Sequence, residues 1–311
     1  MLALNRNYRE DFMNKKAKFN KKNYVGLLYV TPWLIGFLVF TLYPILAAFY
    51  LSFTDYSLMS APNFIGFDNF TKLFSDKTFL KAFGITAKYV IWEVPLKLIF
   101  SLFVAFILNM NIKGINFFRT AYYIPSILGS NVAIAILWKF LFATDGLVNQ
   151  VFGVVGMEPI SWFGQATPAL FTIVLLRVWE FGSTMVIFLS ALKEVPGELY
   201  EAASVDGSNA FRNFFTITIP MITPIIFFNF IMQLVHAFQE FNAPYLITGG
   251  DPMKGTYLLP MLIYDNTFKY FNMGYASAMS WILFIVVMVF TMITFKSSKY
   301  WVYYSDNGGE E

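Results

Sequence analysis

Residues 199–220 read LYEAASVDGSNAFRNFFTITIP, a stretch rich in alanine, serine and polar residues. It lies between two long apolar segments, at about 168–192 and 221–247. Each of these segments reaches the roughly 20 residues that an α-helix needs to cross the hydrocarbon core of a bilayer. The stretch is therefore expected to be a surface element between two membrane spans.

The composition supports a membrane protein. The chain has 311 residues, of which 57% are hydrophobic and 13% are charged, whereas a soluble domain usually carries about 25% charged residues. The complete set of apolar segments is 25–53, 85–109, 118–142, 168–192, 221–247 and 276–296. The first is too long for the apolar region of a signal peptide and has no small-residue cleavage site at its end. We expect an all-α polytopic membrane protein with six transmembrane helices.

Charge distribution gives the expected orientation. A cluster of lysines precedes the first span: Lys15, Lys16, Lys18, Lys21 and Lys22. Because cytoplasmic segments carry an excess of Lys and Arg, this cluster places the N-terminus inside. Six spans then place the C-terminus and residues 199–220 inside as well. The expected organisation is a cytoplasmic tail at 1–23, a transmembrane domain at 24–297 and a second cytoplasmic tail at 298–311.

Several function classes lack their required residues. The chain has no cysteine and a single histidine, His236, so we expect no disulfide, no thiol chemistry and no metal site. No G-x-x-x-x-G-K-[ST] motif occurs, so the chain itself has no P-loop for a nucleotide and no cofactor is expected in it. We also find no convincing Ser/His pair or paired aspartates for an intramembrane enzyme. The chain is expected to be neither an enzyme nor a nucleic-acid-binding protein.

The polar stretch has the signals of two short helices joined by a turn. Pro196 suits the first turn of a helix. Asp206 and Gly207 are a helix-stop signal, because glycine readily takes the left-handed conformation of a C-cap. Ser208 or Asn209 can then cap a second helix that continues to residue 215. We call residues 196–220 the elbow.

The elbow resembles the EAA loop of ABC importer permeases. The resemblance rests on Glu201-Ala202-Ala203, then three residues, Gly207, nine residues, and Ile217-Thr218-Ile219-Pro220. The family usually has Leu where this chain has Ile219. The resemblance implies that the elbow is a coupling helix on which a cytoplasmic ATPase docks. The residues it assigns to ATPase coupling are Glu201, Ala202, Ala203, Asp206, Gly207 and Pro220.

Other stretches extend the resemblance to most of residues 30–296. They are TPWLIGFLVFTLYPILAAFYLSFTDYSL, FIGFDNFTKLF, NFFRTAYYIPSILGSNVAIAILWKFLF and DGLVNQVF, and they are similar to the first, MalF-type permease of carbohydrate ABC importers. The extra N-terminal spans and large insertion of MalF are absent, which favours the plainer six-span members. The resemblance implies the type I ABC importer (MetI/MalF-like) fold and a location in the bacterial plasma membrane.

The same resemblance implies a function and a set of partners. The chain is expected to be the transmembrane permease subunit of an ATP-driven carbohydrate (oligosaccharide) importer. Its implied partners are a second, MalG-type permease, a cytoplasmic ATPase dimer that holds ATP and Mg²⁺, an extracellular solute-binding protein and the sugar itself.

Polar side chains inside the spans suggest a sugar pathway, because such groups are costly in a bilayer unless they serve a partner or a route. The candidates share one helical face in each span: they lie at i, i+3, i+4 and i+7 in the fourth span and at i, i+4, i+7 and i+11 in the fifth. They include an aromatic ring that suits the C–H face of a sugar. The predicted pathway residues are Leu176, Trp179, Glu180, Ser183, Asn229, Gln233, His236 and Glu240.

Other interpretations fit the same residues. One is that these side chains only pack across the bundle, with Glu180 paired to Arg177 and His236 paired to Glu240. Glu93 and Lys97, at i and i+4 of the second span, are read as a structural pair. Glu180 and His236 would also serve a proton relay, so an ion-coupled secondary transporter acting alone is a second hypothesis. Glycerol-3-phosphate permeases share the ABC pattern, but a phosphate favours convergent Arg or Lys, so we expect a neutral sugar.

Overall fold

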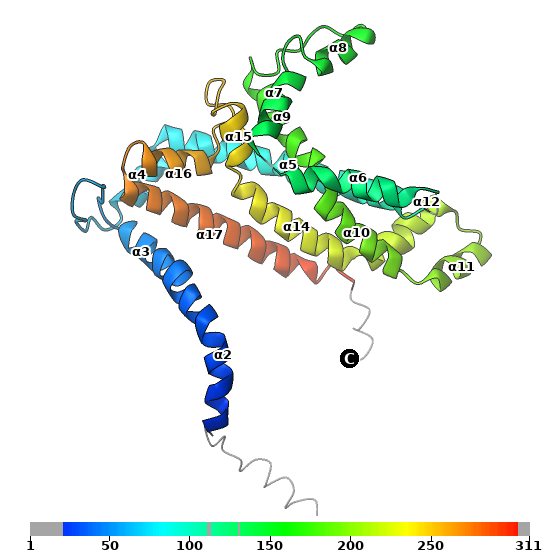
Figure 1. Cartoon of the computed structure of the whole chain (residues 1–311), viewed down its shortest axis with the longest axis horizontal. Coiled ribbons are helices and arrows are strands. Elements are labelled where there is room, and N and C mark those ends of the chain that lie inside the picture. Colours follow the sequence, from blue (N-terminus) through cyan, green and yellow to red (C-terminus); the bar gives the residue numbers. More distant parts are fainter. Residues whose placement is uncertain (1–20, 111–112, 130, 304–311) are drawn as a thin grey trace, which may run out of the picture. The chain divides into compact units, whose positions relative to one another are not determined.

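Helices account for nearly all regular structure in the part of the chain that the computed structural model describes, residues 21–110, 113–129 and 131–303 (Figure 1). Within these ranges the extended pairing is limited to an isolated antiparallel bridge between Thr54 and Phe64. The all-α prediction is confirmed. The chain divides into two units, which meet in sequence between Leu51 and Ser52. The greater part of both predicted tails lies outside the described residues.

The first unit is a long apolar helix with a local change of winding. It consists of α2 (Lys21–Phe37), a π-helical turn η1 (Leu38–Leu42) and α3 (Tyr43–Leu51). Residues Leu28–Leu51 are long and apolar enough to cross a membrane, and none of this window is buried within the chain. Pro44 is the second residue after the π-helical turn. Because proline has no N–H and cannot continue the α-helical bond pattern, the turn absorbs the irregularity and the helix runs on.

The second unit holds the remaining helices. Its long uninterrupted spans are α5 (Lys77–Leu108) and α17 (Met273–Ser298). Three further spans arise if each bent pair is one span: α6 (Ile115–Leu128) with α7 (Val132–Leu141), α9 (Ala166–Trp179) with α10 (Gly182–Glu194), and residues Ala210–Met221 with α14 (Thr223–Phe238). The short elements are α4 (Asp68–Ser75), α8 (Leu147–Val154), α11 (Gly197–Val205), α12 (Ala210–Asn213), η2 (Phe214–Thr218), α13 (Ile219–Met221), α15 (Asn242–Ile247) and α16 (Leu259–Phe268).

Three of the predicted spans need correction. The third and the fourth, each predicted as one helix, are each a bent pair of helices: α6 with α7, and α9 with α10, which meet at 46°. The fifth, predicted to reach residue 247, ends at Phe238, and α15 is a separate helix. The start of α15 is stabilised by Glu240, whose Oε1 accepts a hydrogen bond from the amide of Ala243 at 2.9 Å. This side-chain acceptor satisfies an amide that has no partner inside the first turn of α15.

Helix α5 is the centre of the second unit. It contacts α9, α10, α14 and α16, and α14 also runs alongside α17 (Figure 1). Large side chains that are fully buried at this centre include Tyr89, Phe188, Ile173 and Met185. The packing brings α5 and the two bent spans around a common interior, where the polar side chains collect.

Candidate functional site

A polar cavity of about 450 Å³ lies among α5, α6, α9, α10 and α14. Its walls carry five carboxylate or amide side chains from several helices and helix ends, together with the basic side chains of Lys97 on α5 and Arg177 on α9. The lining residues are Tyr89, Glu93, Lys97, Ser126, Arg177, Glu180, Ser183, Thr184, Gln233, His236, Ala237, Gln239 and Glu240. Because polar groups inside a membrane bundle are costly, this concentration makes the cavity the candidate site.

The break in the fourth span forms one wall of the cavity. Helix α9 ends at Trp179 and α10 begins at Gly182, so backbone groups between them lose their helical partners. Ser126 of α6 supplies new ones: its hydroxyl donates to the carbonyl of Glu180 and accepts from the amide of Ser183, both at 3.0 Å. Backbone breaks at membrane depth require such substitutes, because lipid offers no hydrogen bonds.

Gly182 allows this close approach. A Cβ at Gly182 would lie 2.7 Å from the carbonyl oxygen of Tyr122 and 2.8 Å from the hydroxyl of Ser126. These are distances that real side chains do not reach, and one of the neighbours is backbone. Glycine at this position therefore lets α6 sit directly on the break in the fourth span.

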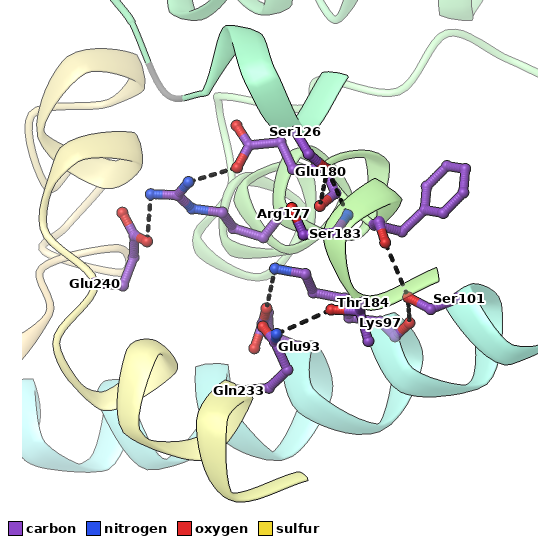
Figure 2. Close-up of polar contacts among 11 residues, drawn as sticks. Glu93, Lys97, Ser101, Ser126, Arg177, Glu180, Ser183, Thr184, Gln233 and Glu240 are labelled. Carbon is purple, nitrogen blue, oxygen red and sulfur yellow. Dashed lines mark hydrogen bonds and ion pairs between the residues drawn. The ribbon is translucent and has the colours of Figure 1, made fainter. Parts of the chain in front are cut away.

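Arg177 joins three helix ends through two ion pairs (Figure 2). Its guanidinium lies 2.6 Å from Glu180, which follows α9, and 2.5 Å from Glu240, which lies between α14 and α15. The side chains of the three residues are 17%, 7% and 8% exposed. The planar fork of arginine can hold two carboxylates at once, so Arg177 ties the fourth span to the end of the fifth.

A second polar group lies across the cavity, between α5, α10 and α14 (Figure 2). Lys97 Nζ lies 3.7 Å from Glu93 Oε1, and the amide of Gln233 donates to the hydroxyl of Thr184 at 3.0 Å. The distance between Lys97 Nζ and Glu93 Oε1 is longer than a hydrogen bond.

Several buried polar atoms of the cavity have no hydrogen-bond partner among the described residues. They are the Tyr89 hydroxyl, Glu93 Oε2, Gln233 Oε1 and Arg177 Nε. Because unmade bonds of buried polar atoms cost free energy, the walls can offer both donors and acceptors to a polar ligand.

The structure gathers Glu180, Ser183, Gln233, His236 and Glu240 around this cavity. Their role in a substrate pathway stays a prediction. The pairing of Glu180 with Arg177 is present, as is the contact of Glu93 with Lys97. Glu240 instead pairs with Arg177 and caps α15, and no hydrogen bond between it and His236 is found among the described residues.

Three predicted pathway residues lie elsewhere. Leu176 is 1% exposed within the apolar core, and Asn229 is buried and donates to the carbonyl of Ile225 in its own helix at 3.1 Å. Trp179 lines a separate, apolar cavity, where its ring lies 5.9 Å from that of Trp138. The prediction assumed one continuous helical face, but α9 ends at Trp179, so side chains before and after the break point in different directions.

Sequence reasoning missed other cavity residues. Tyr89, Ser126 and Thr184 carry no signal in the sequence, because hydroxyl side chains are common in spans and their spacing does not show which of them will face a cavity. Glu93 and Lys97 had a signal, two ionisable groups within a span, but their place in the cavity was not anticipated.

The elbow has the predicted helix–turn–helix form. Helix α11 begins after Pro196 and ends at Val205. Beyond its end Gly207 has φ 76°, and the amides of Gly207 and Ser208 donate to the carbonyls of Ser204 and Ala203. This pattern of bonds is a Schellman C-cap. The predicted cap of the second helix is Asn209, whose side chain accepts from the amide of Arg212 at 2.8 Å.

The elbow has two arms, α11 and the segment formed by α12 and η2. They are joined to each other and to the bundle. The hydroxyl of Tyr200 in α11 lies 2.8 Å from that of Thr218 in η2, and the ring of Phe214 lies 4.9 Å from that of Phe106 in α5. Glu201 and Ala202 remain exposed on the outside of the elbow. The elbow is therefore a pre-formed element with an accessible outer surface.

Comparison with known proteins identifies relatives over almost the whole chain. Residues 115–300 match the family described as "Binding-protein-dependent transport system inner membrane component". The chain is 46% identical over 298 residues to the "Probable ABC transporter permease protein YesP" of Bacillus subtilis (strain 168), covering 94% of this chain and 96% of that protein.

Further relatives are also described as permease proteins of transport systems. The "Arabinooligosaccharides transport system permease protein AraP" of Bacillus subtilis (strain 168) is 31% identical, covering 94% of this chain and 91% of that protein. The "Trehalose/maltose transport system permease protein MalF" of Thermococcus litoralis is 30% identical, covering 93% and 98%. Among solved structures, a chain of a bacterial alginate ABC transporter in complex with its oligosaccharide-bound periplasmic protein has the same fold, with a TM-score of 0.78, 21% identity and coverage of 90% and 95%.

Proposed function

The chain belongs to the inner membrane components of binding-protein-dependent transport systems, and on that premise we propose that it is the transmembrane permease subunit of an ATP-driven carbohydrate importer. The observation that carries the proposal is the direct connection between the elbow and the cavity. Helix α10, with Ser183 and Thr184 on the cavity wall, enters the elbow, and α14, with Gln233 and His236, leaves it. A force applied to the elbow therefore reaches two walls of the polar cavity.

The elbow is proposed as the docking site of a cytoplasmic ATPase. Its exposed surface combines the carboxylate of Glu201 with small Ala202 and with apolar side chains such as Val205 and Phe211, which are 88% and 76% exposed. Small residues let a partner approach closely, and the carboxylate suits a basic partner. ATP and Mg²⁺ then belong to the partner, and the elbow transmits its closure as a rigid lever between two packed bodies.

The cavity is proposed as the point at which a sugar crosses the bundle. A sugar hydroxyl both donates and accepts, and the walls supply acceptors at Glu93 and Gln233 as well as donors at Arg177 and Tyr89. Tyr89 is the aromatic ring in this lining, whereas the predicted Trp179 is not part of it. Recognition here therefore depends on hydrogen bonds more than on stacking. The sugar's identity is not defined by these groups.

Other parts of the proposed complex follow from the family. A solute-binding protein on the outer side delivers the sugar, in line with the family's description. A second permease completes the pathway. Both termini and the elbow then lie on the cytoplasmic side.

An ion-coupled secondary transporter is the competing function, and the cavity's Glu180 and His236 are the observation that favours it. The two are separated in liposomes that contain either this chain alone or the chain with its partner permease and ATPase. Accumulation of radiolabelled oligosaccharide that requires ATP and the partners supports the importer. Accumulation by the chain alone under an ion gradient supports the competitor. Glycerol 3-phosphate in the same assay tests the phosphate alternative.

The elbow itself is tested by a matched pair of substitutions. Glu201→Lys reverses the charge at the proposed docking position, and Glu198→Lys makes the same change at another exposed position of α11. We expect E201K to abolish oligosaccharide uptake and to release the ATPase in a pull-down, while E198K retains both and each protein stays inserted in the membrane. Wild-type uptake by E201K contradicts the proposed role of the elbow.

A further inference from the structure

The bend between the elbow and the fifth span has a side-chain bond where a backbone bond is missing. In an α-helix the carbonyl of Pro220 would accept from the amide of residue 224, but residue 224 is proline and has no N–H. The hydroxyl of Thr223 donates to this carbonyl instead, at 2.7 Å. Residues Ala210–Met221 and α14 meet here at 68°, so Thr223 lies at the hinge of the elbow.

The same hydroxyl also receives a bond from the C-terminal part of the chain. Beyond the end of α17 at Ser298, the backbone amide of Tyr303 donates to Thr223 Oγ1 at 2.9 Å. Thr223 is buried, so its hydroxyl has both its donor and its acceptor capacity used within the protein. One side chain thus connects the elbow, α14 and the segment that follows α17.

Aromatic contacts hold this segment in place. The ring of Trp301 lies 5.8 Å from that of Phe227 in α14, and Phe227 lies 5.1 Å from Phe295 in α17. The amide of Val302 still bonds to the carbonyl of Ser298 at 2.8 Å. We call residues 299–303 the strap.

We propose that the strap and Thr223 lock the hinge, so that the elbow, α14 and α17 move as one body, with Thr223 as the positioning residue. The part of this inference that concerns transport rests on the proposed function, whereas the lock itself is a property of this chain. If the elbow moves, α14 can turn independently of it only when the bond from Thr223 to Pro220 breaks. Because the strap is bonded to Thr223, movement of Thr223 away from Pro220 would also displace the end of α17.

The test measures the distance between the elbow and α17 by spin labels. The chain has no cysteine, so Ser204→Cys on α11 and Lys296→Cys on α17, both exposed, provide its sole labelling sites. The labelled chain is studied in the complete transporter, both without nucleotide and after trapping with ATP and vanadate. With an intact lock, we expect a narrow distance distribution that trapping does not change.

Thr223→Val removes the hydroxyl at nearly constant shape and is expected to broaden the distribution. Detached conformers should increase about fivefold, the change that loss of one ordinary net hydrogen bond produces. Thr223→Ser keeps the hydroxyl and should restore the narrow distribution, an outcome that a purely steric role does not produce. Thr216→Val is the matched control, because its hydroxyl bonds at 2.8 Å to Arg212 within its own arm of the elbow.

Removal of residues 301–311 is the second variant and leaves the bond from Thr223 to Pro220 possible. It should broaden the distribution as Thr223→Val does. A narrow distribution in both variants, or a wild-type distance that changes on trapping, overturns the lock. The lock and the proposed importer can fail separately. If the wild-type distribution is narrow and the Thr223→Val distribution is broad, the lock is supported. If the same complex does not trap nucleotide, the proposed importer is contradicted.

Discussion

Replacement of Arg177 by methionine should destabilise the protein severely, because it leaves two carboxylates in a low-dielectric interior. Glu180 and Glu240 are 7% and 8% exposed, and each lies within 2.6 Å of the guanidinium. At an effective dielectric constant of about 20, each pair of charges about 4 Å apart contributes roughly 4 kcal/mol. Desolvation and repulsion between the two carboxylates offset part of this sum. Removal of one partner of a buried ion pair costs about 3–5 kcal/mol, and we expect R177M to fall in that range.

The measurement is thermal unfolding of the purified complex in lipid nanodiscs. With a shift of about 2–4 °C for each kcal/mol, R177M should unfold about 10 °C below the wild type. Arg177→Lys keeps the charge but has no planar fork, so it should hold one carboxylate and give an intermediate shift. Lys139→Met is the control, because it removes a cation from an exposed position on α7.

The triple variant R177M/E180Q/E240Q separates charge from packing. Neutral amides remove the unpaired charges, so the triple variant should regain most of the stability that R177M loses. Sugar uptake should stay low in both, because the cavity has lost its guanidinium donors. A shift below about 2 °C for R177M, or a triple variant less stable than R177M, would refute the reasoning that this cluster is shielded from water.

Two further predictions concern the break in the fourth span and the start of α5. Gly182→Ala should lower the unfolding temperature by several degrees and reduce uptake, because its Cβ would meet the backbone of α6, at a cost of about 1–3 kcal/mol. Gly84→Ala, inside α5 and with nothing within 4 Å of its Cβ, is the control and should not lower the unfolding temperature, because alanine favours a helix over glycine. Burial opposes the ionised form of Asp76, but hydrogen bonds from Tyr275 and from the amides at the start of α5 outweigh it and lower the pKa of this carboxyl. Asp76→Ala should cost about 1 kcal/mol at pH 7 through loss of the N-cap. Because the pKa of Asp76 is lower in the folded than in the unfolded protein, its ionised carboxylate stabilises the fold above the unfolded pKa of about 4. This stabilisation disappears as the pH falls through the folded-state pKa, so the unfolding temperatures of wild type and variant should converge below about pH 4. A difference that stays constant with pH contradicts the role of the Asp76 carboxylate.

Much of the fold followed from the sequence because its determinants are local. The apolar runs were long enough to define the spans, although their exact ends and breaks were not defined. Within the elbow, a left-handed Gly207 and the cap at Asn209 are properties of neighbouring residues, and the structure has both. The bend near Pro220 and Pro224 has a local cause as well, because two prolines remove backbone donors from one turn.

The cavity depended on contacts between distant segments. The break after Trp179 has no proline and is held by Ser126, a residue more than 50 positions earlier in the chain. That break redirected Trp179 away from the cavity and brought Arg177 within reach of Glu240. No periodicity within the fourth span contains this information.

The sequence by itself determined a helical membrane protein with an exposed elbow between two spans, because length, hydropathy, turn residues and caps act within a few residues of each other. Only the tertiary structure decided which polar side chains meet, since a buried charge takes whichever partner the packing of other helices brings to it. Arg177 shows the difference: its bond to Glu180 is visible in the local spacing, whereas its bond to Glu240 exists only because α15 packs against α9 and brings the preceding Glu240 within reach.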